Sequence, residues 1–210
     1  MRRLNVFALC ILSLVCSAVW TNGQLFHRSS RPQKGATPSP TQPMRKASEL
    51  IRKQEPLKVN QALLKQCTAD NVTIFVSLSK QRAYLMLDEQ IVADEPISSG
   101  KQGHSSPTGH FSVLEKDPDH RSTLYGDFVD AKGRVVRAGI SARIDSAPSG
   151  THYIGAPMKW FLRLTGEGVG MHIGILPGYP ASHGCIRESA EGAKLFYDHV
   201  KIGTPVTVES

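Results

Sequence analysis

Alternating hydrophobic and polar residues dominate the chain from residue 72 onwards. VTIFVSLS at 72–79 and RAYLMLD at 82–88 alternate apolar with polar side chains around a short polar connection. This is the pattern of a β-hairpin with one buried face. Residues 91–98 and 109–117 continue in the same style, and glycines and prolines mark the turns between them. The pattern therefore predicts a domain built mainly from β-strands.

One helix is predicted, close to the C-terminus. Ser189 is a suitable N-cap, Glu191 lies in the first turn, and Gly203 follows the last turn. TPVTVE at 204–209 then predicts a closing strand. Residues 67–210, about 140 in number, are enough for a single hydrophobic core. The apolar stripe of the helix consists of Ala193, Leu195, Phe196 and Val200.

The first residues predict export. Two arginines precede an apolar stretch from Val6 to Val19, which is the order of a secretory signal and is too short to span a bilayer comfortably. Cleavage after Ala18 places small residues at the cleavage positions, so we assign residues 1–18 to a signal peptide. We expect an exported protein of the periplasm or cell wall. A lipoprotein signal acylated at Cys16 and an uncleaved anchor are the alternatives.

The positive charge of the chain is concentrated before the strands. Residues 19–66 carry nine Lys or Arg against two Glu, whereas residues 67–210 carry 14 Lys or Arg against 16 Asp or Glu. The early segment contains RPQKGATPSPTQP, and we interpret it as a basic, Pro-rich tether with short helical pieces divided at Pro56. The tether is either attracted to an anionic envelope surface or is simply a solvated linker. Nucleic-acid binding is not expected, because no aromatic-basic motif is present.

Two cysteines, Cys67 and Cys185, remain after removal of the signal. In an oxidising compartment a disulfide between them is one expectation. The surroundings of Cys185, in YPASHGCIRES at 179–189, favour a reactive thiol instead. Cys67 is then expected to be a half-buried free cysteine.

Histidines lie close to Cys185 in the sequence. A free thiol is mostly protonated near neutral pH, so nucleophilic catalysis needs a neighbouring base or positive charge. His172 and His183 are the candidates, and a strand carrying His172 would face the nucleophile on the next strand. Gly184 leaves backbone N–H groups free to bind an oxyanion, and Arg187 is suited to a substrate carboxylate.

Each of these residues also has a different interpretation. His172 alone is often a satisfied buried histidine, and Arg187 alone is often a surface ion-pair partner. A zinc site of His172, His183 and Cys185 is the metal alternative, but it lacks the paired ligand spacing of structural zinc sites.

The segment from His172 to Arg187, with its SHGCIR block, resembles the signature of the L,D-transpeptidases, which are cell-wall enzymes. PISSGKQGHSSPTGHFSV at 96–113 and GAPMKWFLRLTGEGVGMH at 155–172 resemble the upstream segments of that family. The resemblance covers roughly residues 72–208. It implies a β-sandwich-like catalytic domain with one C-terminal helix.

The resemblance also implies a cysteine acyltransferase that needs no metal or cofactor. Cys185 would attack the carbonyl before the terminal D-residue of a tetrapeptide stem and release D-alanine. His172 would be the general base, oriented by a backbone carbonyl near Ile173. The backbone amides of Gly184 and Cys185 would form the oxyanion hole. Among the residues of the substrate-binding region, Ser182 and His183 would shape the loop, and Arg187 would contact the carboxylate of the substrate.

The resemblance specifies the acceptor less precisely than the catalytic residues. It would typically be a side-chain amine of another stem, which gives a 3–3 crosslink, and an envelope protein is a second candidate. Carbapenem labelling of Cys185 is also expected of the family. Only nine residues separate His172 from Ser182, which predicts a small loop, and Glu188 stands where an apolar residue is frequent, which predicts an effect on acceptor choice.

Two other classes of protein are alternatives. A sortase-like transpeptidase also orders His, Cys and Arg, but its Arg normally lies farther downstream. A catalytically silent wall-binding module would need neither the thiol nor the base.

Overall fold

A computed structural model describes residues 53–210 of the chain. The assigned signal peptide and most of the assigned tether lie outside the described residues. No helix in the described part is both long enough and apolar enough to cross a bilayer. The helices are α2 (Gln61–Leu64) and α3 (Ala190–His199), and the strands are β1 (Lys58–Val59), β2 (Val72–Ser77), β3 (Arg82–Leu87), β4 (Gln90–Ser98), β5 (Gly109–Ser112), β6 (Glu115–Asp117), β7 (Arg121–Asp130), β8 (Val135–Ser141), β9 (Thr151–Pro157), β10 (Phe161–Arg163), β11 (Gly170–Ile173), β12 (Ile186–Glu188) and β13 (Pro205–Glu209).

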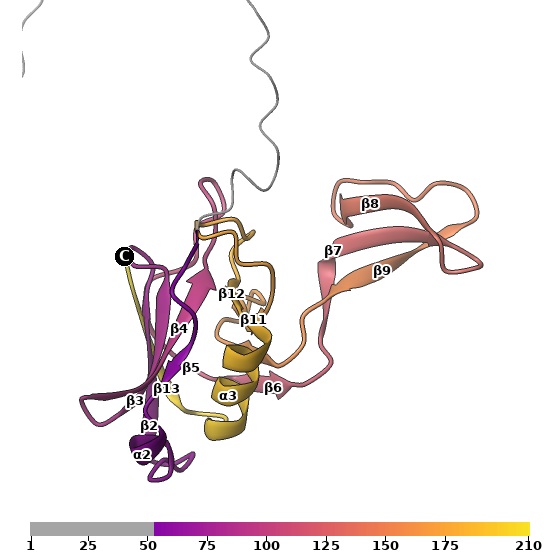
Figure 1. Cartoon of the computed structure of the whole chain (residues 1–210). Helices are drawn as coiled ribbons and strands as arrows, with labels where there is room; N and C mark the ends of the chain where they lie inside the picture. The colour runs from indigo at the N-terminus through magenta and orange to yellow at the C-terminus, as the bar shows by residue number, and fades with distance from the viewer. Residues whose placement is uncertain (1–52) are drawn as a thin grey trace, which may run out of the picture. The chain divides into compact units, whose positions relative to one another are not determined.

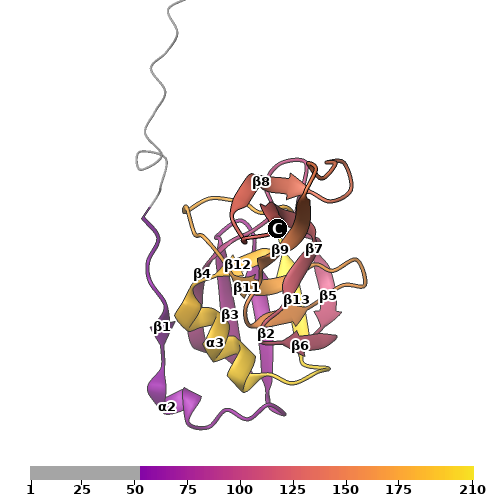
Figure 2. The same cartoon turned by 90° about the vertical axis from the view of Figure 1, so that its right-hand side faces the viewer.

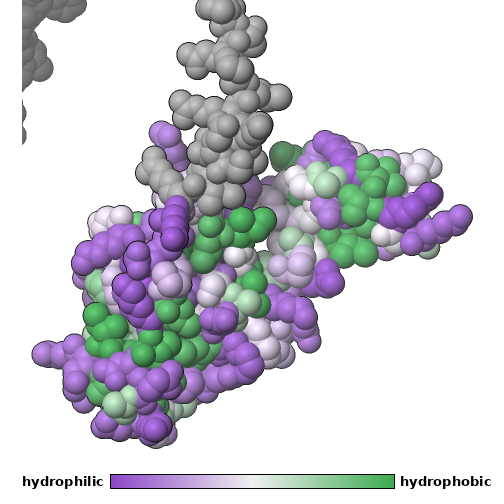
Figure 3. Space-filling model, viewed as in Figure 1, coloured by the Kyte–Doolittle hydropathy of each residue, from purple (hydrophilic) through white to green (hydrophobic). Residues whose placement is uncertain are grey.

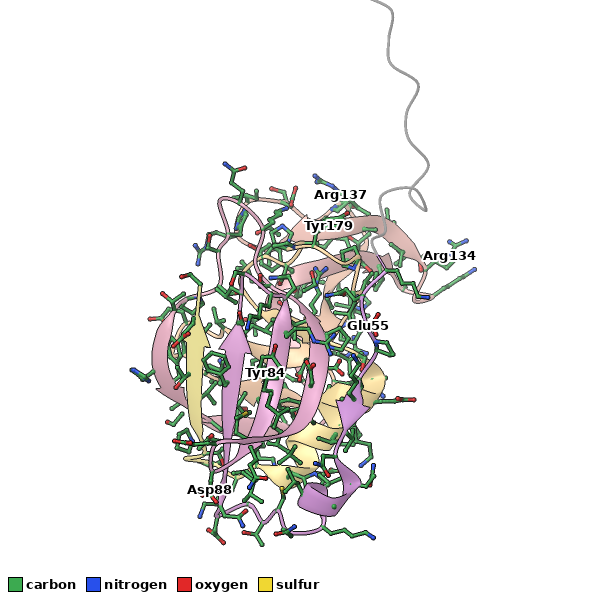
Figure 4. All side chains as sticks on the ribbon, turned by 60° about the vertical axis from the view of Figure 1, so that its left-hand side comes forward. Glu55, Tyr84, Asp88, Arg134, Arg137 and Tyr179 are labelled. Atoms are coloured by element: carbon green, nitrogen blue, oxygen red, sulfur yellow. The ribbon has the colours of Figure 1, made fainter. Side chains whose placement is uncertain are left out.

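The predicted hairpin is confirmed as β2 and β3. The two strands pair antiparallel from Val72 opposite Leu87 to Ser77 opposite Arg82. Residues on one face are buried while those on the other are half-buried or exposed, as the alternation predicts. On the outer face Tyr84, labelled in Figure 4, stacks on Phe75 with ring centroids 6.0 Å apart.

One sheet runs in the order β5-β13-β2-β3-β4-β12-β11-β10-β6, and β1 pairs with β4 beside this path (Figures 1 and 2). The predicted strand at 109–117 is in fact β5 and β6, which lie at opposite ends of that order. At the bend between them the Val113 N–H donates to Thr204 O and the Leu114 N–H donates to Arg163 O. The two ends of the sheet therefore meet at this bend, and the apolar core lies inside the curved sheet.

Helix α3 confirms the predicted C-terminal helix and its start. The Ser189 side chain accepts the Gly192 N–H at 3.0 Å, which makes Ser189 the N-cap. Ala193 and Phe196 are completely buried where the helix packs on β10 and β11 (Figure 2). The mainly β domain with one late helix is therefore confirmed.

A second, three-stranded sheet in the order β8-β7-β9 was not predicted. Val135, Val136 and Ile154 are exposed on it, and Figure 3 shows apolar surface over these strands. Arg134 and Arg137, labelled in Figure 4, form ion pairs within the same region, with Asp130 and Asp145 respectively. Because few side chains of this sheet are buried, its sequence carries little alternation.

The end of the assigned tether is docked on the sheet. The Gln54 side-chain amide donates to Ile97 O at 3.0 Å, and the Arg82 guanidinium donates to Glu55 O at 2.6 Å (Figure 4). Strand β1 and helix α2 follow, and Leu57, Val59, Leu63 and Leu64 pack against the core. The structure differs here from the sequence interpretation: residues 54–64 belong with the folded part, and the short helix after Pro56 begins only at Gln61.

Candidate active site

Strands β11 and β12 carry or adjoin His172, Cys185 and Arg187. The two strands are parallel, with Met171 opposite Ile186 and His172 opposite Arg187. Paired residues of adjacent strands project to the same side of a sheet. Cys185 precedes β12 by one residue and lies two residues before Arg187, so all three side chains belong to one face. His172 therefore lies on one strand and Cys185 directly before the adjacent strand, which is the arrangement that the sequence suggested for a base and a nucleophile.

His172 is held in one orientation. Its side chain is buried, and Nδ1 donates a hydrogen bond to the Ile173 backbone oxygen at 2.7 Å. A carbonyl oxygen only accepts, so Nδ1 carries the proton and Nε2 keeps the free lone pair. The predicted carbonyl contact is thereby confirmed. Burial lowers the pKa of His172 to about 4, with smaller lowering effects from Arg187 and His120 and an opposing effect of the Ile173 bond.

Cys185 is a half-buried free thiol. The sulfur lies 3.8 Å from Gly168 O. Burial raises the pKa of Cys185, although the Gly170 N–H and the positive charges of Arg187 and Arg163 act in the opposite direction. The free site therefore holds a neutral thiol and a neutral imidazole at neutral pH.

Cys67 is free as well, so the disulfide alternative is not found. It is half-buried as predicted, and its thiol donates to Leu63 O at 3.4 Å. Burial raises the pKa of the Cys67 thiol.

Ser182 and His183 occupy different environments. Ser182 is buried and held through its backbone, since its N–H donates to Ser99 O at 3.0 Å and its carbonyl accepts the Lys101 N–H at 2.9 Å. His183 is exposed, with ring centroids 4.8 Å from His104 and 4.6 Å from Tyr125. His183 therefore lies at the rim of the site, whereas His172 lies inside it.

Arg187 is half-buried beside the thiol. A methyl group added at Gly174 would lie only 2.6–2.8 Å from its aliphatic stem, so the backbone of Gly174 makes room for this side chain. No carboxylate within residues 53–210 forms an ion pair with Arg187. The interpretation of Arg187 as a surface ion-pair partner is therefore not supported, and its guanidinium can receive a carboxylate.

The structure does not support the zinc alternative. Over the described residues the one group of three ligand-type side chains with ligand atoms within 4.8 Å is Glu115, Asp117 and His120. His172, His183 and Cys185 form no such group.

Glu188 corrects one expectation. Its carboxyl group is completely buried, on the side of β12 opposite to Arg187, so it cannot contact an acceptor. Burial, together with the neighbouring Glu95, raises the pKa of Glu188 well above 4.5. Neither of its oxygens has a hydrogen-bond partner, whereas one oxygen of Glu95 accepts the Ser189 N–H at 2.7 Å. Glu95 thereby supports the residue at which α3 begins.

Several residues that hold the site were not assigned a role from sequence. Ser98 Oγ donates to Tyr179 O at 2.8 Å and accepts the Ala181 N–H at 3.2 Å. Ser106 Oγ donates to Gly184 O at 2.7 Å and accepts the Gly100 N–H at 2.9 Å. These serines lie in the segment at 96–113, whose family resemblance was the available signal. Apart from Gly100, their partners are about 80 positions away, which no local pattern reveals.

The sequence matches a family model described as the L,D-transpeptidase catalytic domain over residues 71–208. The chain therefore belongs to the L,D-transpeptidase catalytic domain family. This match favours the L,D-transpeptidases over the sortase-like alternative. Family members act on the stem peptides of cell-wall peptidoglycan. No curated protein matches the sequence significantly.

Solved structures resemble the chain at low identity. An L,D-transpeptidase from Mycobacterium smegmatis is 22% identical, with a TM-score of 0.49, over 67% of this chain and 59% of its own. One from Xylanimonas cellulosilytica is 24% identical, with a TM-score of 0.49, over 66% and 60%. L,D-transpeptidase 3 from Mycobacterium tuberculosis, solved with a faropenem-derived adduct, is 24% identical, with a TM-score of 0.48, over 67% and 60%. The matched region thus spans about three fifths of these chains.

Proposed function

We propose that this protein is a peptidoglycan L,D-transpeptidase that works through a Cys185 thioacyl-enzyme. Family membership supports the class of reaction. The observation that carries the proposal is the hydrogen bond from His172 Nδ1 to Ile173 O, because it leaves Nε2 free to accept a proton on the face shared with Cys185. Burial keeps that imidazole neutral at working pH.

The acylation step begins when His172 Nε2 takes the thiol proton as Cys185 Sγ attacks the carbonyl that precedes the terminal D-residue of a tetrapeptide stem. A carbon–sulfur bond forms, and the carbonyl oxygen becomes an oxyanion. The backbone N–H groups of Gly184 and Cys185 stabilise that charge. Collapse breaks the carbon–nitrogen bond, and the imidazolium gives its proton to the departing amine of D-alanine.

The transfer step reverses these roles. An acceptor amine attacks the thioester, His172 takes a proton from it, and the sulfur leaves and is reprotonated. A diaminopimelate side chain of another stem would give a 3–3 crosslink, and an envelope protein amine is the second acceptor. Ser182 and His183 shape the loop, while Arg187 receives a substrate carboxylate.

The cellular location of the reaction follows from the location of its substrate. Peptidoglycan stems lie outside the cytoplasmic membrane, which agrees with an exported protein carrying the signal assigned to residues 1–18. The basic tether of residues 19–66 would then contact the anionic envelope surface.

Purified protein incubated with disaccharide-tetrapeptide muropeptides tests the proposal. Release of D-alanine with formation of a crosslinked dimer is expected, and Cys185→Ala should abolish both products while leaving the fold intact. Binding of the muropeptides without any turnover by the wild type would show a silent wall-binding module instead.

A further inference from the structure

Ser106 connects two parts of the chain that are distant in sequence. It lies in the loop between β4 and β5 and is almost completely buried, with 4% of its surface exposed. Its hydroxyl donates to Gly184 O at 2.7 Å and accepts the Gly100 N–H at 2.9 Å. Because an N–H group can only donate and a carbonyl oxygen can only accept, the direction of the hydroxyl proton is fixed.

The carbonyl that Ser106 holds belongs to a functional peptide group. Gly184 C=O and Cys185 N–H are the two ends of one planar trans peptide, so they point in opposite directions. A hydrogen bond that fixes the carbonyl therefore also fixes the direction of the Cys185 N–H. Donation to the carbonyl polarises the peptide as well, which makes the N–H a better donor.

Gly184 itself places little restraint on this peptide. Gly184 has a φ of +127°, a conformation that favours glycine, and a methyl group added there would have Val169 Cγ2, at 3.7 Å, as its nearest neighbour. The chain on this side of the thiol is therefore not fixed by side-chain packing at Gly184. Ser106 supplies the restraint from the neighbouring loop.

The loop that carries Ser106 is itself anchored to the SHGC block. Gly100 forms a parallel bridge with Ser182, and the Lys101 N–H donates to Ser182 O at 2.9 Å. A side chain at Gly100 would lie 2.0 Å from His104 O and 2.6 Å from Ser106 N, so only glycine allows the loop to fold back this closely. The hydroxyl is thus held rigidly with respect to the peptide it contacts.

We infer that Ser106 is a positioning residue that aims the Cys185 N–H into the oxyanion hole through its hydrogen bond to Gly184 O. This inference rests on the proposed function, because the oxyanion forms only if Cys185 attacks a carbonyl. Ser106 does not touch the reacting atoms. Its contribution is confined to steps that create negative charge on a carbonyl oxygen.

Two reactions of the same thiol separate this role from a structural one. A carbapenem acylates the sulfur: the thiol attacks the β-lactam carbonyl, the ring carbon–nitrogen bond breaks, and the thiol proton ends on the ring nitrogen. That reaction passes through an oxyanion. Iodoacetamide alkylates the sulfur by displacing iodide and forms no oxyanion.

We expect Ser106→Ala to slow imipenem acylation of Cys185 by roughly tenfold to a hundredfold, somewhat less than loss of a whole oxyanion donor. The rate of Cys185 alkylation, followed by mass spectrometry of its peptide, should stay within about twofold of wild type, since no oxyanion develops. Ser106→Thr retains a hydroxyl and should restore most of the acylation rate. Ser105→Ala is the matched control, because Ser105 is the exposed neighbour.

The outcomes distinguish the inference from the proposed function. Equal acylation rates for wild type and Ser106→Ala would overturn the role of Ser106 while leaving the transpeptidase intact. A parallel fall in acylation and alkylation, or a large drop in melting temperature, would show that Ser106 only supports the fold. If wild type itself is not acylated at Cys185, the proposed function fails and the inference fails with it.

Discussion

The low pKa of His172 predicts how the rate of acylation depends on pH. Burial lowers the pKa of this histidine to about 4, so its imidazole stays neutral and able to accept a proton well below neutral pH. A histidine with that pKa is about 90% neutral at pH 5, whereas one with the ordinary pKa of about 6.5 is about 3% neutral. The rate of acylation depends on the neutral fraction.

Lowering the pH from 7 to 5 should therefore reduce kcat/KM for acylation by only about 10%, compared with roughly 25-fold for a histidine of ordinary pKa. The rate should rise on the alkaline side, because burial also raises the pKa of Cys185 and thiolate forms late. The assay is the second-order rate of imipenem acylation, measured by intact-protein mass spectrometry between pH 4.5 and 9. Circular dichroism at each pH controls for unfolding.

An acid limb with an apparent pKa of 6 or above would refute this reasoning, because it would mean that a solvated histidine serves as the base. A plateau of iodoacetamide reactivity extending down to pH 5 would also refute it. That plateau is the behaviour of a preformed thiolate–imidazolium pair, which the buried neutral site excludes.

Three further predictions concern single residues. His172→Ala should slow acylation by roughly a hundredfold or more, and His183→Ala should have a smaller effect; the reverse order would make His183 the base. Burial beside Glu95 raises the pKa of Glu188 in the folded protein, so stability falls as pH rises above 4.5. Glu188→Gln should therefore make the fall in unfolding free energy between pH 5 and 6 smaller, measured by urea titration beside the exposed control Glu89→Gln, and an unchanged fall would contradict the buried acid. Cys67→Ala should leave transpeptidation unchanged, whereas loss of activity would assign the second thiol a role.

Local patterns in the sequence were sufficient for part of the fold. The β2–β3 hairpin was predictable because one of its faces is buried and the other is not. The start of α3 was predictable because the Ser189 cap acts within three residues. The sheet of β7, β8 and β9 was not, since most side chains of β8 are exposed and the burial signal is weak.

The candidate site was likewise predictable only in part. Resemblance to a family proposed Cys185 and His172 as a pair, and it also implied the contact of His172 with the Ile173 carbonyl, which the structure contains. The burial of Glu188 depends on β4, which lies more than 90 residues earlier in the chain, and no periodicity within β12 reveals it. The contact between Ser106 and Gly184 spans 78 residues and exists only after the loop has folded onto the SHGC block.

The proposed mechanism requires the Cys185 sulfur to carry the acyl group between the two steps. Wild-type protein should be incubated with a tetrapeptide stem in the absence of an acceptor, quenched in acid, and digested for mass spectrometry of both cysteine peptides. We expect a thioester of the tripeptide on Cys185, with an equal amount of released D-alanine and an unmodified Cys67. A Cys67–Cys185 disulfide, or D-alanine release that persists in Cys185→Ala, would contradict it.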